Sequence, residues 1–306
     1  MAKAVRAASR VAFVGLVLAY SSCLALGKDA ANGADESTDL APAPNLYLDL
    51  RTNYATFPAG SLSIGFGSFG VFSGQPALLS LANASNFATL PAVSSPSGRG
   101  IGLDVPLTSD LNDWLSLYGG FSASASRTNL SDWSAFTINS WNIGFQADVY
   151  QQNGGLVPTI TLQSTLTVSV PQAQLPTTSL NTVLEFDYAL TADETKGLLA
   201  GVQYIEVAVN SAVITINPNI VGYVGGYYQW DNNWKLTGRV GMQSFGGAQL
   251  LNQIPFKPFT QPTVRLDLDR MDADDNRLFG ITAHIAWVPK PSYLLTVRTP
   301  LYLVKN

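Results

Sequence analysis

Hydrophobic and polar residues alternate one by one along most of this chain, from about residue 45 to the last few positions. In the segment 141–149, the odd positions carry Trp, Ile, Phe, Ala and Val, and the even positions carry Asn, Gly, Gln and Asp. Side chains of a strand point alternately to two faces, so this segment has one apolar and one polar face. No helical period interrupts the pattern, which therefore predicts an all-β chain.

The alternation predicts about twelve strands, within a range of ten to fourteen. They are expected at about 45–72, 101–108, 115–126, 141–149, 158–170, 184–190, 205–210, 213–230, 235–243, 264–269, 279–287 and 293–303. The first range is interpreted as one long bent strand or two short ones, and the facing of 213–230 is ambiguous. In the seventh, Ile205, Val207 and Val209 are assigned to the apolar face and Glu206 to the polar face.

The connections between these strands fall into two kinds. Short turns are expected at 109–113, 151–155, 192–196, 231–233 and 270–276, and longer loops at 75–98, 171–181 and 246–261. With an even strand number, the short turns all fall on the side of the two chain ends and the longer loops on the other. Bacterial outer-membrane barrels have this asymmetry, with short periplasmic turns and longer outer loops.

Closure of the sheet follows from the chemistry of a membrane. An unpaired backbone group in hydrocarbon costs several kcal/mol, so a spanning sheet cannot keep an open edge. Aromatic residues also cluster near predicted strand ends, as in interfacial girdles, at Trp114, Trp141, Tyr150, Trp230, Trp234, Trp287 and Tyr293. We therefore predict a single antiparallel transmembrane β-barrel. The alternative is a soluble secreted β-sandwich, in which these aromatics would belong to the core.

The N-terminal segment has the organisation of a secretion signal. Residues 1–27 combine Lys3, Arg6 and Arg10 with an apolar stretch and small residues before Lys28, which predicts a cleaved signal peptide. The alternatives are an uncleaved anchor and a lipoprotein modified at Cys23. Residues 28–44 are predicted to be a flexible periplasmic lead-in, and residues 45–306 the outer-membrane barrel.

Composition narrows the class and the partners. Charged residues make up 12% of the 306-residue chain and hydrophobic residues 46%, without the long apolar runs of helical membrane proteins after the first segment. Removing the signal would leave 14 basic against 21 acidic residues, a net charge of −7. An acidic chain is a poor match for nucleic acid, so we expect membrane lipid and no nucleic acid as partners.

Two stretches carry a resemblance to a known group of proteins. The segment 227–241 and the segment 278–288, with the strand that follows it, resemble hairpins of Gram-negative outer-membrane β-barrels, in particular transporter-like or porin-like barrels of about twelve strands. The resemblance implies an outer-membrane location and the barrel-insertion machinery as a partner. The chain departs from the pattern at its end, where Leu303-Val-Lys-Asn306 replaces the usual terminal Phe or Trp.

The polar faces of the predicted strands carry charges of both signs, with acids commoner. We predict a pore-lining set made of Asp49, Arg51, Asp104, Asp148, Glu185, Asp187, Glu206, Lys235, Arg239, Arg265, Asp267, Asp269, His284 and Arg298. One interpretation is a hydrated passage that mildly favours cations. The other is a lumen filled by ion-paired side chains, as in smaller barrels.

Catalytic and metal-binding patterns give weaker matches. His284 is the only histidine, and its neighbours on the same face, Thr282 and Ala286, do not supply the serine of a lumenal hydrolase. Asp272 to Asn276 begins like a calcium loop, but Arg277 and Ala283 stand where glycine and glutamate are needed. We therefore expect no catalytic residue, no metal and no cofactor.

Three functions of such a barrel are distinguished. The leading hypothesis is passive or facilitated passage of an unidentified small solute through a polar lumen. The alternatives are a plugged structural or adhesive barrel that acts through its outer loops, and an outer-membrane lipid-modifying enzyme that would depend on His284.

Overall fold

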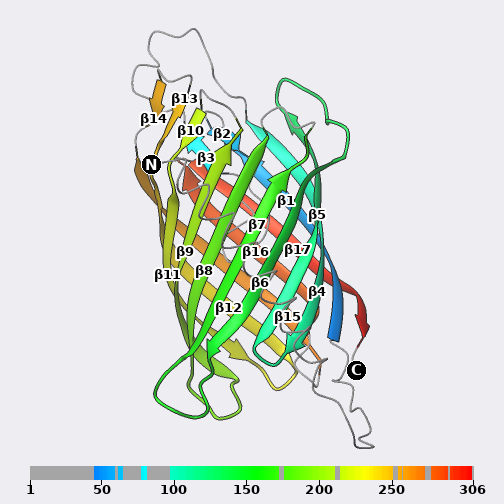
Figure 1. The fold of residues 1–306 in the computed structure, drawn as a ribbon, viewed down its shortest axis with the longest axis vertical. Coiled ribbons are helices and arrows are strands. Elements are labelled where there is room, and N and C mark those ends of the chain that lie inside the picture. The colour runs from blue at the N-terminus through cyan, green and yellow to red at the C-terminus, as the bar shows by residue number, and fades with distance from the viewer. Residues whose placement is uncertain are drawn as a thin grey trace, which may run out of the picture. The chain divides into compact units, whose positions relative to one another are not determined.

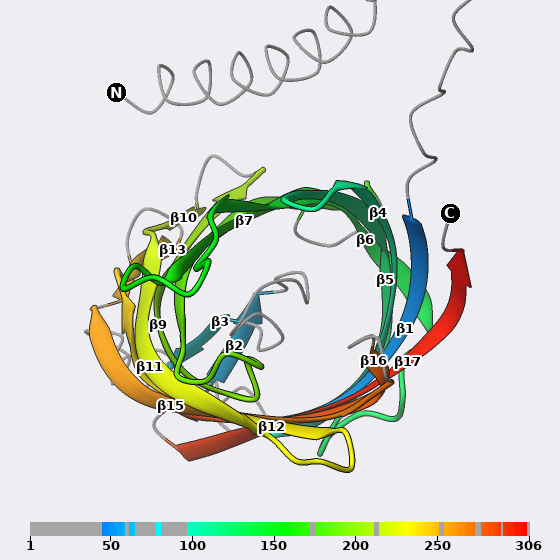
Figure 2. The same cartoon turned by 90° about the horizontal axis from the view of Figure 1, so that it is seen from below.

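The described residues form a closed antiparallel β-barrel. A computed structural model describes residues 45–58, 61–64, 77–80, 97–171, 176–210, 214–250, 254–256, 258–272, 277–288 and 290–304. Within these residues, twelve strands close a ring in the order β1-β17-β16-β15-β12-β11-β9-β8-β7-β6-β5-β4 (Figures 1 and 2). The predicted fold class and strand number are confirmed. The predicted signal peptide and lead-in lie outside the described residues.

The ring strands are 11 to 15 residues long, which suits tilted strands that cross a bilayer. They are β1 (Asn45–Phe57), β4 (Gly98–Asn112), β5 (Leu115–Thr128), β6 (Thr137–Tyr150), β7 (Thr159–Ser169), β8 (Thr177–Ala189), β9 (Lys196–Val209), β11 (Asn219–Gln229), β12 (Trp234–Phe245), β15 (Phe259–Met271), β16 (Arg277–Val288) and β17 (Lys290–Val304). β1 pairs with β4 on one side and with β17 on the other, and this second pairing closes the ring.

The two rims of the barrel differ in their connections. Leu46 pairs with Val304, so the first and last strands begin and end at one rim, here called the terminal rim. The strand ends that flank 113–114, 151–158, 190–195, 230–233 and 272–276 lie at this rim. At the opposite rim, here called the distal rim, lie the strand ends that flank 58–97, 129–136, 170–176, 210–218, 246–258 and position 289. The longest connections, 58–97 and 246–258, are at the distal rim, as predicted, whereas 151–158 at the terminal rim is slightly longer than 170–176 at the distal rim.

The alternating pattern separates the outer face from the lumen along β6. The side chain of Trp141 is 53% exposed and that of Ile143 points the same way, whereas Asn142 is only 6% exposed. Exposed apolar side chains recur on the other strands, at Leu107 on β4, Val240 on β12 and Leu295 on β17. An outer apolar surface around a closed ring is the surface that hydrocarbon requires.

The predicted facing is wrong on β9. Ile205, Val207 and Val209 are buried on the lumenal face, and Glu206 lies on the outer face beside Tyr204, whose hydroxyl is 3.4 Å from a Glu206 carboxylate oxygen. Glu206 is therefore removed from the predicted pore-lining set. The error arose because the lumenal wall is itself apolar at this level, so residue polarity did not report the direction of the side chain.

Five short strands are not part of the ring in the described residues. β2 (Ser61–Ile64) pairs with β3 (Ala77–Ser80), and β10 (Ile214–Ile216), β13 (Ala248–Leu250) and β14 (Ile254–Phe256) form a three-stranded sheet. The region 45–72 is therefore a ring strand followed by a separate short strand. The ranges 75–98 and 246–261, predicted as loops, contain strands because their pairing partners are other connections, which periodicity alone does not reveal. Figure 2 shows the β2–β3 hairpin inside the ring, and β3 contacts β16.

Aromatic side chains mark both rims on the outer face. Trp114, Tyr150 and Trp230 are exposed next to the turns of the terminal rim, and Trp287 and Tyr293 are exposed on either side of position 289 at the distal rim. This placement is typical of the two interfaces of a membrane-spanning barrel. No helix in the described part of the chain is long and apolar enough to cross a membrane.

Candidate functional site on the lumenal wall

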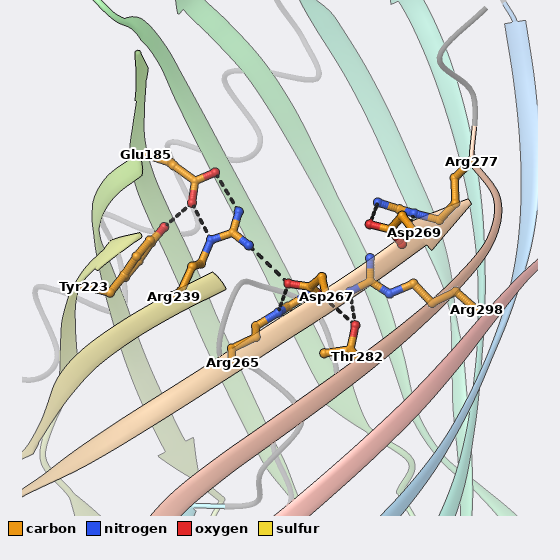
Figure 3. A network of polar contacts seen from close by, with 9 residues as sticks. All are labelled: Glu185, Tyr223, Arg239, Arg265, Asp267, Asp269, Arg277, Thr282 and Arg298. Carbon is orange, nitrogen blue, oxygen red and sulfur yellow. Dashed lines mark hydrogen bonds and ion pairs between the residues drawn. The ribbon is translucent and has the colours of Figure 1, made fainter. Parts of the chain in front are cut away.

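A continuous network of charged side chains crosses the lumenal wall from β8 to β17 (Figure 3). Glu185 on β8 accepts hydrogen bonds from Arg239 on β12, through Nε at 3.1 Å and Nη2 at 3.2 Å. Arg239 also donates from Nη1 to Asp267 Oδ2 on β15, at 3.2 Å. The arginine therefore joins two carboxylates that lie on different strands of the wall.

Asp267 is the centre of this network. Its carboxylate accepts hydrogen bonds from Arg265 at 2.7 and 2.8 Å, from Arg239 at 3.2 Å, and from Arg298 at 3.4 Å. The Thr282 hydroxyl donates to the same carboxylate at 2.5 Å and in turn accepts from Arg298 Nη2 at 3.1 Å. Charge-assisted hydrogen bonds in a partly buried setting are stronger than neutral ones, so Asp267 holds β12, β15, β16 and β17 together along the wall.

Two glycines let Glu185 reach Arg239. The register aligns Glu185 with Gly201 on β9 and Tyr223 on β11, and Gly225 on β11 pairs with Arg239. A Cβ atom on Gly201 would lie 2.5 Å from the Tyr223 ring, and the Tyr223 hydroxyl donates to Glu185 at 2.7 Å. The missing side chain on β9 thus leaves the space that the tyrosine ring occupies when its hydroxyl contacts Glu185.

The part of the wall that β5 to β7 form carries mostly neutral contacts. The Tyr118 hydroxyl lies 2.6 Å from Thr165 Oγ1 and accepts a hydrogen bond from Gln163 at 3.0 Å. The Thr161 hydroxyl donates to Asp148 at 2.8 Å. Charge is therefore unevenly distributed around the lumen, and most of it is concentrated on β8, β12 and β15 to β17.

The structure brings together five members of the predicted pore-lining set, which are Glu185, Arg239, Arg265, Asp267 and Arg298. Asp269 forms a separate ion pair with Arg277 at 2.7 Å. Arg51 and Asp49 are 3.8 Å apart on β1, and Asp104 on β4 accepts a hydrogen bond from Asn53 at 2.9 Å. Whether these residues line an open pore stays a prediction.

Asp187 and Lys235 both interact with Tyr227 near the terminal rim. The Lys235 ammonium lies 4.3 Å from the centre of the Tyr227 ring, and the Tyr227 hydroxyl interacts with the Asp187 carboxylate. These contacts stand apart from the network around Asp267, and they join β8, β11 and β12 close to the turns.

Three residues that contact the predicted pore-lining set were not predicted from the sequence: Tyr223 and Thr282 in the network, and Arg277 in the separate pair with Asp269. Arg277 was judged only as a misfit in a calcium loop, and Tyr223 fell in the aromatic stretch whose facing was ambiguous. Thr282 was assigned to the lumen without a role. Arg265, Asp267 and Asp269 share the lumenal face of one strand. Their neighbours Tyr223 and Arg277 lie on other strands, so they could be recognised only once the strand pairing was known. Residues 273–276, most of the calcium-like stretch, lie outside the described residues.

His284 is enclosed rather than presented to the lumen. Its ring is 4% exposed, and Nε2 lies 2.6 Å from the hydroxyl of Thr263, which is 1% exposed. A hydroxyl nucleophile must reach a substrate carbonyl as well as its base. The Thr263 hydroxyl is within reach of the His284 ring as a base, but both side chains are buried, so a substrate cannot reach the hydroxyl in this structure.

The ring closure, the apolar outer face and the inward charges define the class: this is an outer-membrane β-barrel protein. No protein-family model and no curated protein sequence matches the chain. Among solved structures, it is similar to an outer membrane channel from Pseudomonas putida F1, with a TM-score of 0.52, 11% identity, and coverage of 89% of this chain and 100% of the other.

Two autotransporter barrels are also similar at lower scores. The translocator domain of NalP from Neisseria meningitidis has a TM-score of 0.41 and 12% identity, with coverage of 95% of this chain and 97% of that one. The transport unit of AIDA-I from Escherichia coli has a TM-score of 0.46 and 9% identity, with coverage of 91% and 95%. At these identities the likeness concerns the fold.

Proposed function

We propose that this barrel is a channel that lets a small polar solute cross the outer membrane. The observation that carries the proposal is the charged network itself, which lies on the lumenal wall and uses residues of both signs from strands that are far apart in sequence. A wall of this kind offers fixed donors and acceptors to a hydrated solute, and charged rings are a general means of selection in pores.

The position of the network supports transport better than catalysis. Its carboxylates are held by arginines, whereas a general base must be able to take up a proton. The Thr263–His284 pair, which comes nearest to a nucleophile and base, is covered. We therefore propose a non-enzymatic role in which the network acts through charge and shape.

Single-channel recording in planar bilayers tests this proposal. The refolded protein, identified as a closed barrel by its heat-dependent shift on a denaturing gel, should give discrete current steps in KCl. A preparation that inserts and shows the gel shift, yet carries no current in KCl or with small organic ions, would contradict the channel function.

A second candidate is a plugged barrel that acts through its outer loops, and one observation favours it. The β2–β3 hairpin lies inside the ring in Figure 2, and lumenal side chains such as Gln203, Val221 and Ala286 are fully buried. A folded barrel without current, whose binding to surfaces is lost when the distal connections are shortened, would support this candidate. A clear conductance would count against it.

A further inference from the structure

Two arginines lie directly opposite each other on the outer face of the barrel, near the distal rim. Arg99 on β4 pairs with Arg127 on β5, and both side chains are exposed. The face is the outer one because Arg99 shares it with the exposed Ile101, whereas Gly100 between them is buried on the lumenal side. Directly opposite residues point to the same face, with Cβ atoms about 5 Å apart. These two residues are here called the arginine pair.

The backbone holds the arginine pair in place. The ladder between β4 and β5 continues past it to Gly98 and Thr128, and the Asn129 N–H then donates to the Ser97 carbonyl at 2.9 Å. Like charges directly opposite each other on neighbouring strands are destabilising. Because the backbone is paired on both sides of them, the two arginines cannot move apart by fraying of the strand ends.

The described residues supply no negative charge to the arginine pair. The other neighbour of Arg99 in the ring is Thr56 on β1, which is uncharged. The connection after β5 contains Asp132, but neither arginine forms an ion pair or a hydrogen bond with it or with any other described residue. A compensating anion is therefore expected from outside the chain.

Cations on the outer face of the terminal rim are placed differently. Lys196 Nζ lies 5.2 Å from the centre of the Tyr228 ring, and the guanidinium carbon of Arg270 lies 5.8 Å from the centre of the Trp234 ring. The face of an aromatic ring attracts a cation. The arginine pair has no such ring contact among the described residues, so its charge is left for a partner in the surroundings.

The arginine pair lies at the depth of lipid head groups. Arg127 comes thirteen residues after Trp114, which is exposed at the terminal rim. Along a strand tilted by about 40°, this length rises by roughly 33 Å, which exceeds the apolar band of about 25 Å. Arg127 therefore reaches just beyond the hydrocarbon on the distal side. The chain ends and short turns mark the periplasmic side of such barrels, so the distal side faces the outer leaflet.

Exposed aromatic side chains lie in the segment next to the arginine pair. Beyond the end of β5 the chain turns back, and the Ser134 N–H donates to the Ser126 carbonyl at 2.8 Å. Trp133 and Phe136 belong to this returning segment, and both are exposed. Aromatic side chains favour the boundary between acyl chains and head groups. Apolar side chains beside a cationic pair suit a molecule that has both an anionic head group and acyl chains.

We propose that the arginine pair binds a phosphate group on the head group of an outer-leaflet lipid, and that Trp133 and Phe136 contact the same lipid. A phosphate monoester carries close to two negative charges at neutral pH, and its oxygens accept hydrogen bonds from two guanidinium groups. One such group therefore neutralises both arginines. The site is on the outer face, so the inference goes beyond the channel proposal and does not depend on it.

Native mass spectrometry of the barrel refolded in detergent tests the site, because refolded protein carries no outer-membrane lipid. Lipid A with both phosphate groups should form a one-lipid complex, and the same lipid A without phosphates should bind at least tenfold more weakly. We expect R99Q and R127Q each to weaken binding of the phosphorylated lipid about tenfold, because each removes a charge-assisted contact. Inorganic phosphate at the same concentration should not displace the lipid, and displacement would overturn the assignment to a lipid.

R270Q is the matched control, because it removes the same charge from the outer face at the terminal rim. It should leave lipid A binding unchanged. The heat-dependent gel shift shows whether each variant is folded, and the comparison of the two lipids on the native barrel decides the matter even if a variant does not fold. Equal binding of the dephosphorylated lipid, an equal loss in R270Q, or unchanged binding in both R99Q and R127Q would refute the inference.

Discussion

Gly201 and Tyr223 face each other across β9 and β11, and a Cβ atom on the glycine would lie 2.5 Å from the tyrosine ring. This close approach places the Tyr223 hydroxyl 2.7 Å from Glu185. The long ion-pair network thus depends on a residue that has no side chain of its own.

Replacing Gly201 by alanine should push the Tyr223 ring away and weaken its contact with Glu185. We expect a loss of about 1–3 kcal/mol in the free energy of unfolding, as for other overpacking changes. Urea unfolding in lipid vesicles measures it. Gly222 on β11 is the control because a Cβ there meets nothing within 4 Å, and equal losses in G201A and G222A would contradict the role given to Gly201.

The two faces of β6 should respond differently to the same charge. By alternation, Phe145 shares the outer face of Trp141, and Gln146 shares the lumenal face of the buried Asn142, so F145R would place a cation in hydrocarbon. We expect F145R to cost about 2–4 kcal/mol and Q146R to be tolerated. Vesicle unfolding of both variants decides the matter, and similar losses would mean that the facing of β6 is wrong.

Removing the charge of Asp267 should be more damaging than removing that of Asp148. D267N leaves Arg239, Arg265 and Arg298 without their shared carboxylate, whereas Asp148 accepts from the neutral Thr161. We expect D267N to destabilise the barrel by about 3 kcal/mol, in the range for a broken buried pair. A D148N variant with the larger loss would contradict the central place of Asp267.

The facing of β9 can be read by labelling. The chain has one cysteine, Cys23, which can be replaced before introducing E206C or V207C. A spin label at position 206 should be accessible to oxygen dissolved in lipid, and one at position 207 should be shielded, because Val207 is buried on the lumenal side. The reverse result would restore Glu206 to the lumen.

The turn at the terminal rim gives one prediction for pH. Hydrogen bonds from Thr191 and Thr195 lower the pKa of the Asp193 carboxyl, which is exposed to solvent. Because the pKa is lower in the folded state, this contribution to stability is present above the usual aspartate pKa and is lost as pH falls through the folded value. Carbon NMR titration of T191A should show the pKa rising toward its usual range, and an unchanged pKa would exclude the Thr191 contact.

The sequence by itself determined the class of architecture. A two-residue period maintained over most of the chain leaves few alternatives to strands. The outward-facing side chains of β6, Trp141 and Ile143, can be recognised from this local period alone. The even strand number followed from the lengths of the connections, because turns at one rim of a barrel share a side of the membrane.

Tertiary structure decided what the pattern could not contain. Alternation reports polarity and assumes that apolar means outward, so it failed at Ile205, Val207 and Val209, where the lumenal wall is apolar. Alternation also could not show that Arg51 lies opposite Arg298, or that Glu185 on β8 contacts Tyr223 on β11 across Gly201 of β9. These relationships join different strands, and their register is set by the closure of the ring. The direction of a side chain is a local property, whereas its partner across the sheet depends on how the whole chain pairs.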